Sequence, residues 1–176
     1  MPRLLSCLAA VLCLLAAPAA WAVTVEKVVS PGGIEAWLVQ DHANPILALD
    51  FSIEGGAALD PAGKEGLAAM LAGLLDEGAG PHDSQTFQGL LDDHAIQLGF
   101  EAGLDGFGGK LKTLTRERDL AFSLLRLALT APRFDAEPVE RIRSQLLSGL
   151  AREAQSPEAT AARHWYQSAF PGHPYG

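Results

Sequence analysis

The period with which apolar residues recur changes along this chain, and that change restricts the fold more than any other feature of the sequence. Between residues 46 and 53, apolar side chains occupy every second position, as on one face of a β-strand. From residue 61 onward the spacing becomes three and four residues, which is the period of a helix with one buried face. This helical set consists of Leu67, Met70, Leu71, Leu74 and Leu75. The pattern predicts a buried helix that stops at the glycine-rich residues 78–81.

The rest of the chain continues to combine strands and helices. Residues 23–29 and 34–39 flank a turn sequence and predict a β-hairpin. A second helix is expected to start at a cap formed by Asp83 or Ser84 and to end near Asp93. Its inward side chains are expected to be Phe87, Leu90 and Leu91.

The second half begins with two more predicted strands, 96–104 and 107–115, joined at the turn dipeptide Asp105-Gly106. Three helical stretches follow, at 116–129, 135–154 and 157–170. The order of strands, helices, a hairpin and then helices predicts an α+β fold. In this fold a largely antiparallel sheet has helices packed on one face.

Residues 1–22 have the layout of a secretory signal peptide, with cleavage expected after Ala22. One basic residue, Arg3, precedes an apolar run that is too short to span a bilayer and is broken at Pro18. We therefore expect a periplasmic or otherwise exported protein. Cys7 and Cys13 both lie in this segment, so the processed chain has no thiol from which to form a disulfide.

The chain of 176 residues is acidic, with 13 Lys and Arg against 21 Asp and Glu and a formal charge of −8. This charge repels a phosphate backbone, so we expect no nucleic-acid partner. After cleavage of the signal peptide we expect no membrane association, because no second apolar stretch is long enough to cross a bilayer. The five histidines do not pair with one another at metal-ligand spacing, and we expect them to have surface or capping roles.

Several arginines near the end of the chain could form solvated pairs with glutamates on helix faces. They are Arg141, Arg143, Arg152 and Arg163. The alternative is that they form a partner surface or contact a peptide carboxylate.

Four short segments, taken in order, carry a resemblance to a known family. They are the Asn44-Pro45 break before the long strand, residues 54–57 after it, residues 63–75 entering the helix, and residues 170–176 at the end. In this order and spacing the chain resembles the N-terminal domain of insulinase- and pitrilysin-type zinc metallopeptidases. The resemblance covers nearly all of residues 23–176.

Active members of that family have the motif H-x-x-E-H on a helix, where two histidines bind zinc and the glutamate acts as general base. By the resemblance, these positions are Ala69, Ala72 and Gly73, and the third ligand, a glutamate on a later helix, is Gly149. None of these residues can bind a metal or transfer a proton. The resemblance therefore implies no catalytic residues, no metal and no cofactor. The small residues at 69, 72 and 73 also predict a helix face that packs closely.

By the same resemblance, the chain is expected to be a catalytically inactive, exported subunit that pairs with an active homologous zinc-peptidase subunit. It would help to bind or enclose an unfolded or extended peptide, by strand addition to an exposed sheet edge. Members of the family usually continue into a second, related domain, so the sequence is expected to be a fragment. Two alternatives remain open: an active zinc metallopeptidase whose site is misaligned, and a structural module of the cell envelope.

Overall fold

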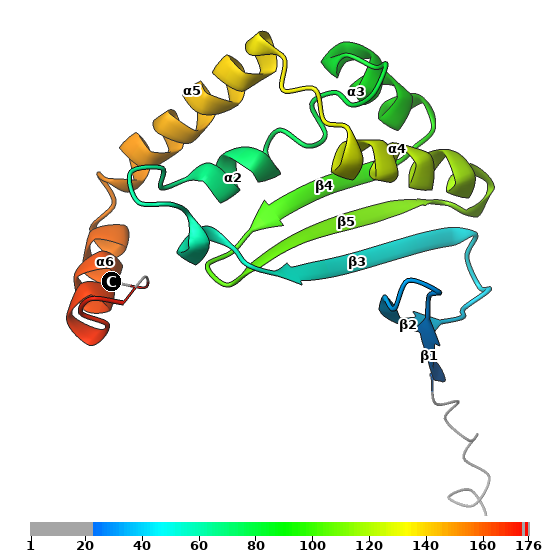
Figure 1. The fold of residues 1–176 in the computed structure, drawn as a ribbon, viewed down its shortest axis with the longest axis horizontal. Helices are drawn as coiled ribbons and strands as arrows, with labels where there is room; N and C mark the ends of the chain where they lie inside the picture. The colour runs from blue at the N-terminus through cyan, green and yellow to red at the C-terminus, as the bar shows by residue number, and fades with distance from the viewer. Residues whose placement is uncertain (1–22, 174, 176) are drawn as a thin grey trace, which may run out of the picture. The chain divides into compact units, whose positions relative to one another are not determined.

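The structure is a computed structural model that describes residues 23–173 and 175. The predicted signal peptide, residues 1–22, lies outside the described residues. The chain divides into two compact units, Met1–Asn44 and Pro45–Gly176. The described part of the first unit contains one hairpin, and the second unit contains a three-stranded sheet and the helices (Figure 1).

The hairpin in the first unit consists of β1 (Val25–Val29) and β2 (Glu35–Val39), which pair antiparallel from Val25 opposite Val39 to Val29 opposite Glu35. The Ser30 amide donates to the Ile34 carbonyl at 2.8 Å and closes the turn. This confirms the predicted hairpin.

The second unit is built on the sheet β3-β5-β4, in which both pairings are antiparallel. The strands are β3 (Ile46–Glu54), β4 (Gln97–Ala102) and β5 (Gly106–Leu114). The helices are η1 (Ala57–Leu59), α2 (Leu67–Ala72), α3 (Ser84–Asp93), η2 (Thr115–Glu117), α4 (Arg118–Thr130), α5 (Ala136–Glu153) and α6 (Pro157–Ala169). Each predicted strand and helix has a counterpart.

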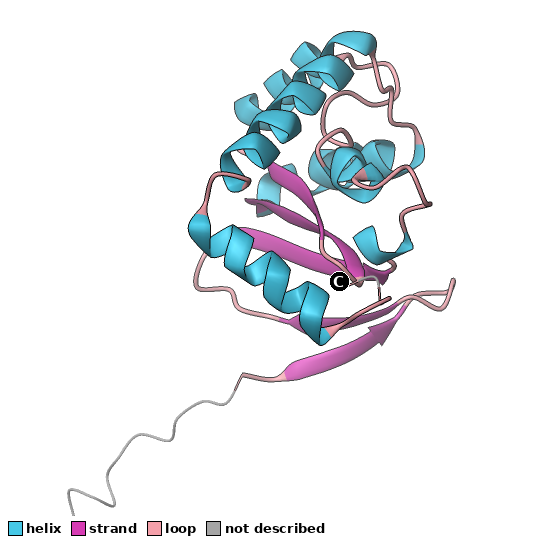
Figure 2. Cartoon of the chain, turned by 90° about the vertical axis from the view of Figure 1, so that its left-hand side faces the viewer, coloured by secondary structure: helices cyan, strands magenta, loops and turns pink. Residues whose placement is uncertain are grey.

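One face of this sheet is covered by helices, among which α2, α3 and α4 gather above the strands (Figure 1 and Figure 2). Leu111 of β5, Phe87 of α3 and Leu124 of α4 are at most 1% exposed and form the centre of the core. Leu49 and Leu98 face this core from the two outer strands. The predicted α+β fold, with a largely antiparallel sheet and helices on one face, is confirmed.

The second predicted helix starts where its cap was expected. The Asp83 side chain accepts a hydrogen bond from the Thr86 amide at 2.9 Å, so Asp83 is the N-cap of α3. Phe87 and Leu91 are buried and Leu90 is half-buried against the core, as predicted. None of the helices in the described part of the chain is long and apolar enough to span a lipid bilayer.

The first predicted helix was wrong in its extent and partly in its buried face. Helix α2 ends at Ala72, and the Leu74 amide donates to the Leu71 carbonyl, three residues earlier, at 3.0 Å. This tighter hydrogen bond turns the chain, so Leu74 and Leu75 are buried whereas Leu67 and Leu71 remain exposed. The exposed pair lines a shallow apolar hollow with Ile53 and Phe107.

Candidate functional site

Helix α2 and its C-cap Gly73 contain the three positions that the resemblance matches to the motif H-x-x-E-H. Its start is fixed by Asp60, whose carboxylate accepts hydrogen bonds from the Gly66 amide at 2.7 Å and the Ala68 amide at 3.0 Å. Ala69 is half-buried and Ala72 is 7% exposed. The methyl groups of both alanines occupy sites that would need an imidazole and a carboxylate for zinc chemistry.

Gly73, the C-cap of α2, lies in close contact with helix α5. A Cβ atom built on Gly73 would lie 2.9 Å from Cγ2 of Ile142, a residue of α5 that is 8% exposed. That separation is shorter than a normal carbon–carbon contact, so α5 can pack here only because position 73 has no side chain. The close packing predicted at this small-residue face is thus made by Ile142.

The fourth position, Gly149, is not part of this contact. It lies on α5 two helical turns beyond Ile142, and no heavy atom lies within 4 Å of a Cβ built on it. Within residues 23–173 and 175, no three His, Cys, Asp or Glu side chains are grouped closely enough to hold a metal ion. The structure places positions 69 and 72 on α2 and position 73 at its C-cap, whereas position 149 lies on α5.

Adding a methyl group at the two emptied glycine positions is expected to have opposite effects. Gly73→Ala forces the β-branched Ile142 to move and should lower the free energy of unfolding by about 1–3 kcal/mol. Gly149→Ala meets open space inside a helix and should raise it by about 0.5–1 kcal/mol. Urea denaturation monitored by circular dichroism measures both values.

The matched control is Gly89→Ala, which is also within a helix and meets no atom within 4 Å. It should behave like Gly149→Ala. If Gly73→Ala stabilised the protein as much as these two variants, the close approach of Ile142 would not constrain this position.

A polar cluster follows α2 and links it to two other helices. The Glu77 carboxylate accepts hydrogen bonds from the Ser84 hydroxyl at 2.6 Å and from the Arg141 guanidinium. Arg141 also donates to Glu137 one turn earlier on α5, at 3.3 Å. Because the Glu77 side chain is 12% exposed, this charge is held in place by partners from α3 and α5.

Asp76 lies beside this cluster and is half-buried. Burial, together with the neighbouring charge of Glu77, raises the pKa of Asp76 to about 6, although its own backbone amide and Arg141 act in the opposite direction. The sequence does not predict this cluster, because Glu77 and Arg141 are 64 residues apart. The adjacent carboxyls of Asp76 and Glu77 were the only signal available.

Stability is expected to depend on pH through Asp76. Because the pKa of Asp76 is higher in the folded protein than in the unfolded chain, the folded state holds the proton more tightly. The free energy of unfolding should therefore fall as the pH rises from about 4 to about 6, by roughly 1–3 kcal/mol. Urea denaturation at pH 4.5 and pH 7.5 measures this change.

Asp76→Asn removes the ionisable group and should flatten this part of the pH dependence. It should stabilise the protein at pH 7.5 and have little effect near pH 4. Asp93→Asn, at an exposed position at the end of α3, is the control and should leave the profile unchanged. An unaltered profile in Asp76→Asn would show that other groups cause it.

Strand β4 provides the second feature of the site, an unpaired sheet edge. In the described part of the chain β4 pairs with β5 only, and α2 packs beside it. In an antiparallel ladder, alternate residues of an edge strand point their N–H and C=O groups away from the neighbouring strand. These groups are available to an added strand.

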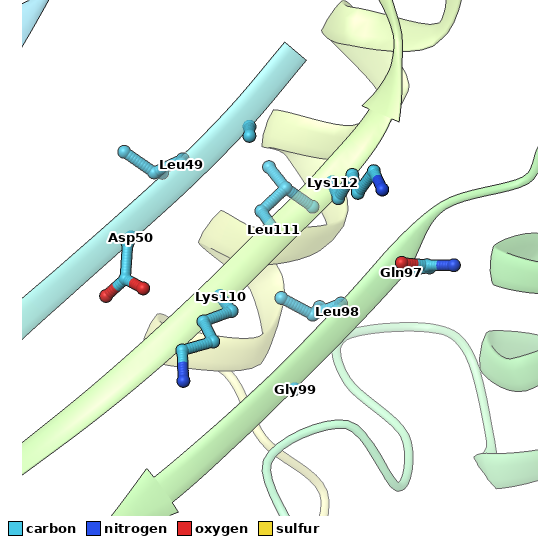
Figure 3. A pocket seen from close by; sticks show the side chains of 9 residues that line it. Leu49, Asp50, Gln97, Leu98, Gly99, Lys110, Leu111 and Lys112 are labelled. Atoms are coloured by element: carbon cyan, nitrogen blue, oxygen red, sulfur yellow. The ribbon is translucent and has the colours of Figure 1, made fainter. Parts of the chain in front are cut away.

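The face of the sheet opposite the core is exposed beside this edge. Asp50, Gln97, Lys110 and Lys112 project from the three strands around Gly99, as Figure 3 shows. Lys110 forms an ion pair with Glu101 of β4 at 3.0 Å. The edge of β4 therefore separates an apolar, helix-covered face from a polar one.

The comparisons with known proteins agree with the predicted fold. No family model matches the chain. The curated protein it resembles is the non-peptidase homologue YmxG of Helicobacter pylori, which is 26% identical over 114 residues. The match covers 65% of this chain and 26% of YmxG, so the chain spans about a quarter of that protein.

Three solved structures share the fold. The inactive domain of an M16 peptidase from Pseudomonas fluorescens superposes with a TM-score of 0.80 and 22% identity, over 87% of this chain and 37% of that one. A Helicobacter pylori protease superposes with a TM-score of 0.74 and 17% identity, over 88% of this chain and 37% of the protease. Pitrilysin superposes with a TM-score of 0.73 and 19% identity, over 89% of this chain and 17% of pitrilysin.

These likenesses confirm the resemblance seen in the sequence. The solved structures show the fold, which is that of M16 peptidase domains. The curated relative is a non-peptidase homologue, and the matching Pseudomonas fluorescens domain is inactive. The chain thus has the fold of M16 peptidase domains and resembles proteins described as a non-peptidase homologue and as an inactive domain.

Proposed function

We propose that this chain is part of an exported, non-catalytic subunit that pairs with an active zinc-peptidase subunit and holds an extended peptide along the edge of β4. The observation that carries the proposal is the edge of β4, which no other strand among residues 23–173 pairs with and which lies beside α2, a helix without His, Cys, Asp or Glu. Binding without cleavage is the role that remains for such a site.

The chemistry of the edge supports a peptide as the ligand. Main-chain hydrogen bonds from an added strand give affinity with little dependence on sequence. The side chains of that strand would alternate between Leu98 and Phe100 on the core side and Gly99 and Glu101 on the polar side. The ligand would be an unfolded or extended polypeptide with alternating apolar and polar residues.

Site-directed crosslinking tests where the peptide binds. In full-length protein with Cys7 and Cys13 replaced by serine, a photoreactive group is attached through Gln97→Cys on β4 or Ser52→Cys on β3. Both positions are exposed. A permanently unfolded, carboxymethylated polypeptide should crosslink at position 97 and not at position 52.

The same polypeptide, N-methylated at alternate residues, should compete for crosslinking at position 97 at least tenfold more weakly than the unmethylated polypeptide. The reason is that it cannot donate the main-chain hydrogen bonds. Equal crosslinking at both positions, or equal competition by the methylated polypeptide, would exclude strand addition at β4.

The pairing with an active subunit is tested by native mass spectrometry after co-expression with a homologue that carries H-x-x-E-H. A complex of one copy of each chain is expected, and two separate monomers would contradict it.

A further inference from the structure

A small hollow lies at the tip of the β4–β5 hairpin, beside the end of α5 and helix α6. It has a volume of about 320 Å³. Its lining includes Leu104 in the hairpin turn, Glu153 at the end of α5, Arg163 and Tyr166 on α6, and Tyr175. The small residues Ala159 and Ala162 of α6 complete it and leave its centre open.

Aromatic contacts hold one wall of the hollow in place. Tyr166 stacks on Phe170 with ring centroids 5.9 Å apart, and Phe170 meets Tyr175 edge-on at 5.6 Å. The Tyr175 hydroxyl donates a hydrogen bond to the Asp105 carboxylate, which ties this wall to the hairpin turn. A wall fixed by its own contacts needs little ordering when a ligand binds.

The turn itself is also fixed by backbone hydrogen bonds. The Ala57 amide donates to the Gly103 carbonyl and the Ala58 amide to the Leu104 carbonyl, both at 2.9 Å. Leu104 is therefore held two residues beyond Ala102, where β4 ends. Because Leu104 also lines the hollow, the hollow lies next to the segment that continues β4.

Arg163 is the only cationic side chain that lines the hollow, and within the described part of the chain it has no ion-pair partner. A guanidinium presents paired N–H donors that match the two oxygens of a carboxylate. Glu153, in the same lining, repels an additional acidic group. The hollow therefore fits a single carboxylate next to an apolar or basic side chain.

We infer that this hollow binds the last residue of an extended peptide, with its C-terminal carboxylate on Arg163 and its side chain against Leu104 and Tyr166. The inference rests on the proposed binding of a peptide at β4. It requires the peptide to run in the same direction as β4, since its C-terminal end then lies at the hairpin turn. The hollow would select peptides with a free C-terminus.

Fluorescence anisotropy with four versions of one labelled extended peptide tests this inference on the full chain. The versions have a free or amidated C-terminus and a free or acetylated N-terminus, and the label is on an internal side chain. Amidation should weaken binding about fivefold to tenfold, because a charge-assisted hydrogen-bond pair is lost. Acetylation of the N-terminus should have no effect.

The variant Arg163→Gln should bind the free acid and the amide equally, whereas the control Arg143→Gln, which breaks only the exposed pair with Glu140, should keep the difference. If binding does not depend on the state of the C-terminus, or is weakened by acetylation of the N-terminus instead, the inference is overturned and the proposed function is not. If none of the four peptides bound, both would fail.

Discussion

Gly56→Ala is expected to destabilise the sheet unit by about 3 kcal/mol or more, a large effect for one methyl group. A Cβ atom on Gly56 would overlap the Gly103 carbonyl oxygen and would lie 2.8 Å from that of Leu104 and 2.9 Å from the Gly106 nitrogen. The backbone of Gly56 is extended, with φ −128°, so the cost arises from collision alone.

The collision cannot be relieved cheaply, because all three atoms belong to the backbone. The same turn is held by hydrogen bonds from the amides of Gly55, Ala57 and Ala58, each 2.9 Å long. Moving the turn away from a new methyl group would lengthen these bonds as well. We expect the urea concentration at the midpoint of unfolding to fall by a large amount, while the dependence of the free energy of unfolding on urea concentration stays unchanged.

Gly99→Ala is the matched control, since Gly99 is also in the sheet unit but its built Cβ meets no atom within 4 Å. It should change the free energy of unfolding by less than about 0.5 kcal/mol. If the two variants were equally stable, the close contact between residues 55–58 and the hairpin turn would be contradicted. The fixed position of Leu104, which lines the hollow at the tip of the β4–β5 hairpin, would then be contradicted as well.

The order of elements could be predicted from the sequence because each depends on local patterns. The alternation at residues 46–53 and the turn at Asp105-Gly106 specify two strands without reference to the rest of the chain. The cap at Asp83 specifies the start of α3 in the same way. These features correspond to β3, the β4–β5 hairpin and α3.

The end of α2 could not be predicted in this way, because it depends on tertiary packing. The apolar spacing continues through Leu74 and Leu75, but the helix stops at Ala72, where Ile142 of α5 lies against Gly73. Leu67 and Leu71 fit the helical pattern and are nevertheless exposed. Gly73 and Ile142 are 69 positions apart, so the spacing of apolar residues along the helix does not predict their contact.

The resemblance predicts the positions matched to the zinc motif, whereas the sequence did not predict the groups around them. The cluster of Asp76, Glu77 and Arg141 depends on how α5 crosses the end of α2, and the hollow at Arg163 depends on where the aromatic residues of α6 pack. Both are defined by distances between elements, which a single sequence does not encode in any local spacing. The sequence favoured solvated pairs between these arginines and glutamates, and a contact with a peptide carboxylate was only part of the alternative.

Phe87→Ala is expected to have an equally large effect on the core, lowering the free energy of unfolding by about 3–5 kcal/mol. Phe87 is fully buried, and it shares the core with Leu111 of the central strand and Leu124 of α4, so its removal leaves a cavity between sheet and helices. Phe122→Ala on α4 is the control. Its ring is 41% exposed, and the same truncation should cost clearly less. Urea denaturation should show the larger loss in free energy of unfolding for Phe87→Ala, because Phe87, unlike Phe122, connects α3, α4 and β5. Similar losses for the two variants would contradict a core centred on Phe87.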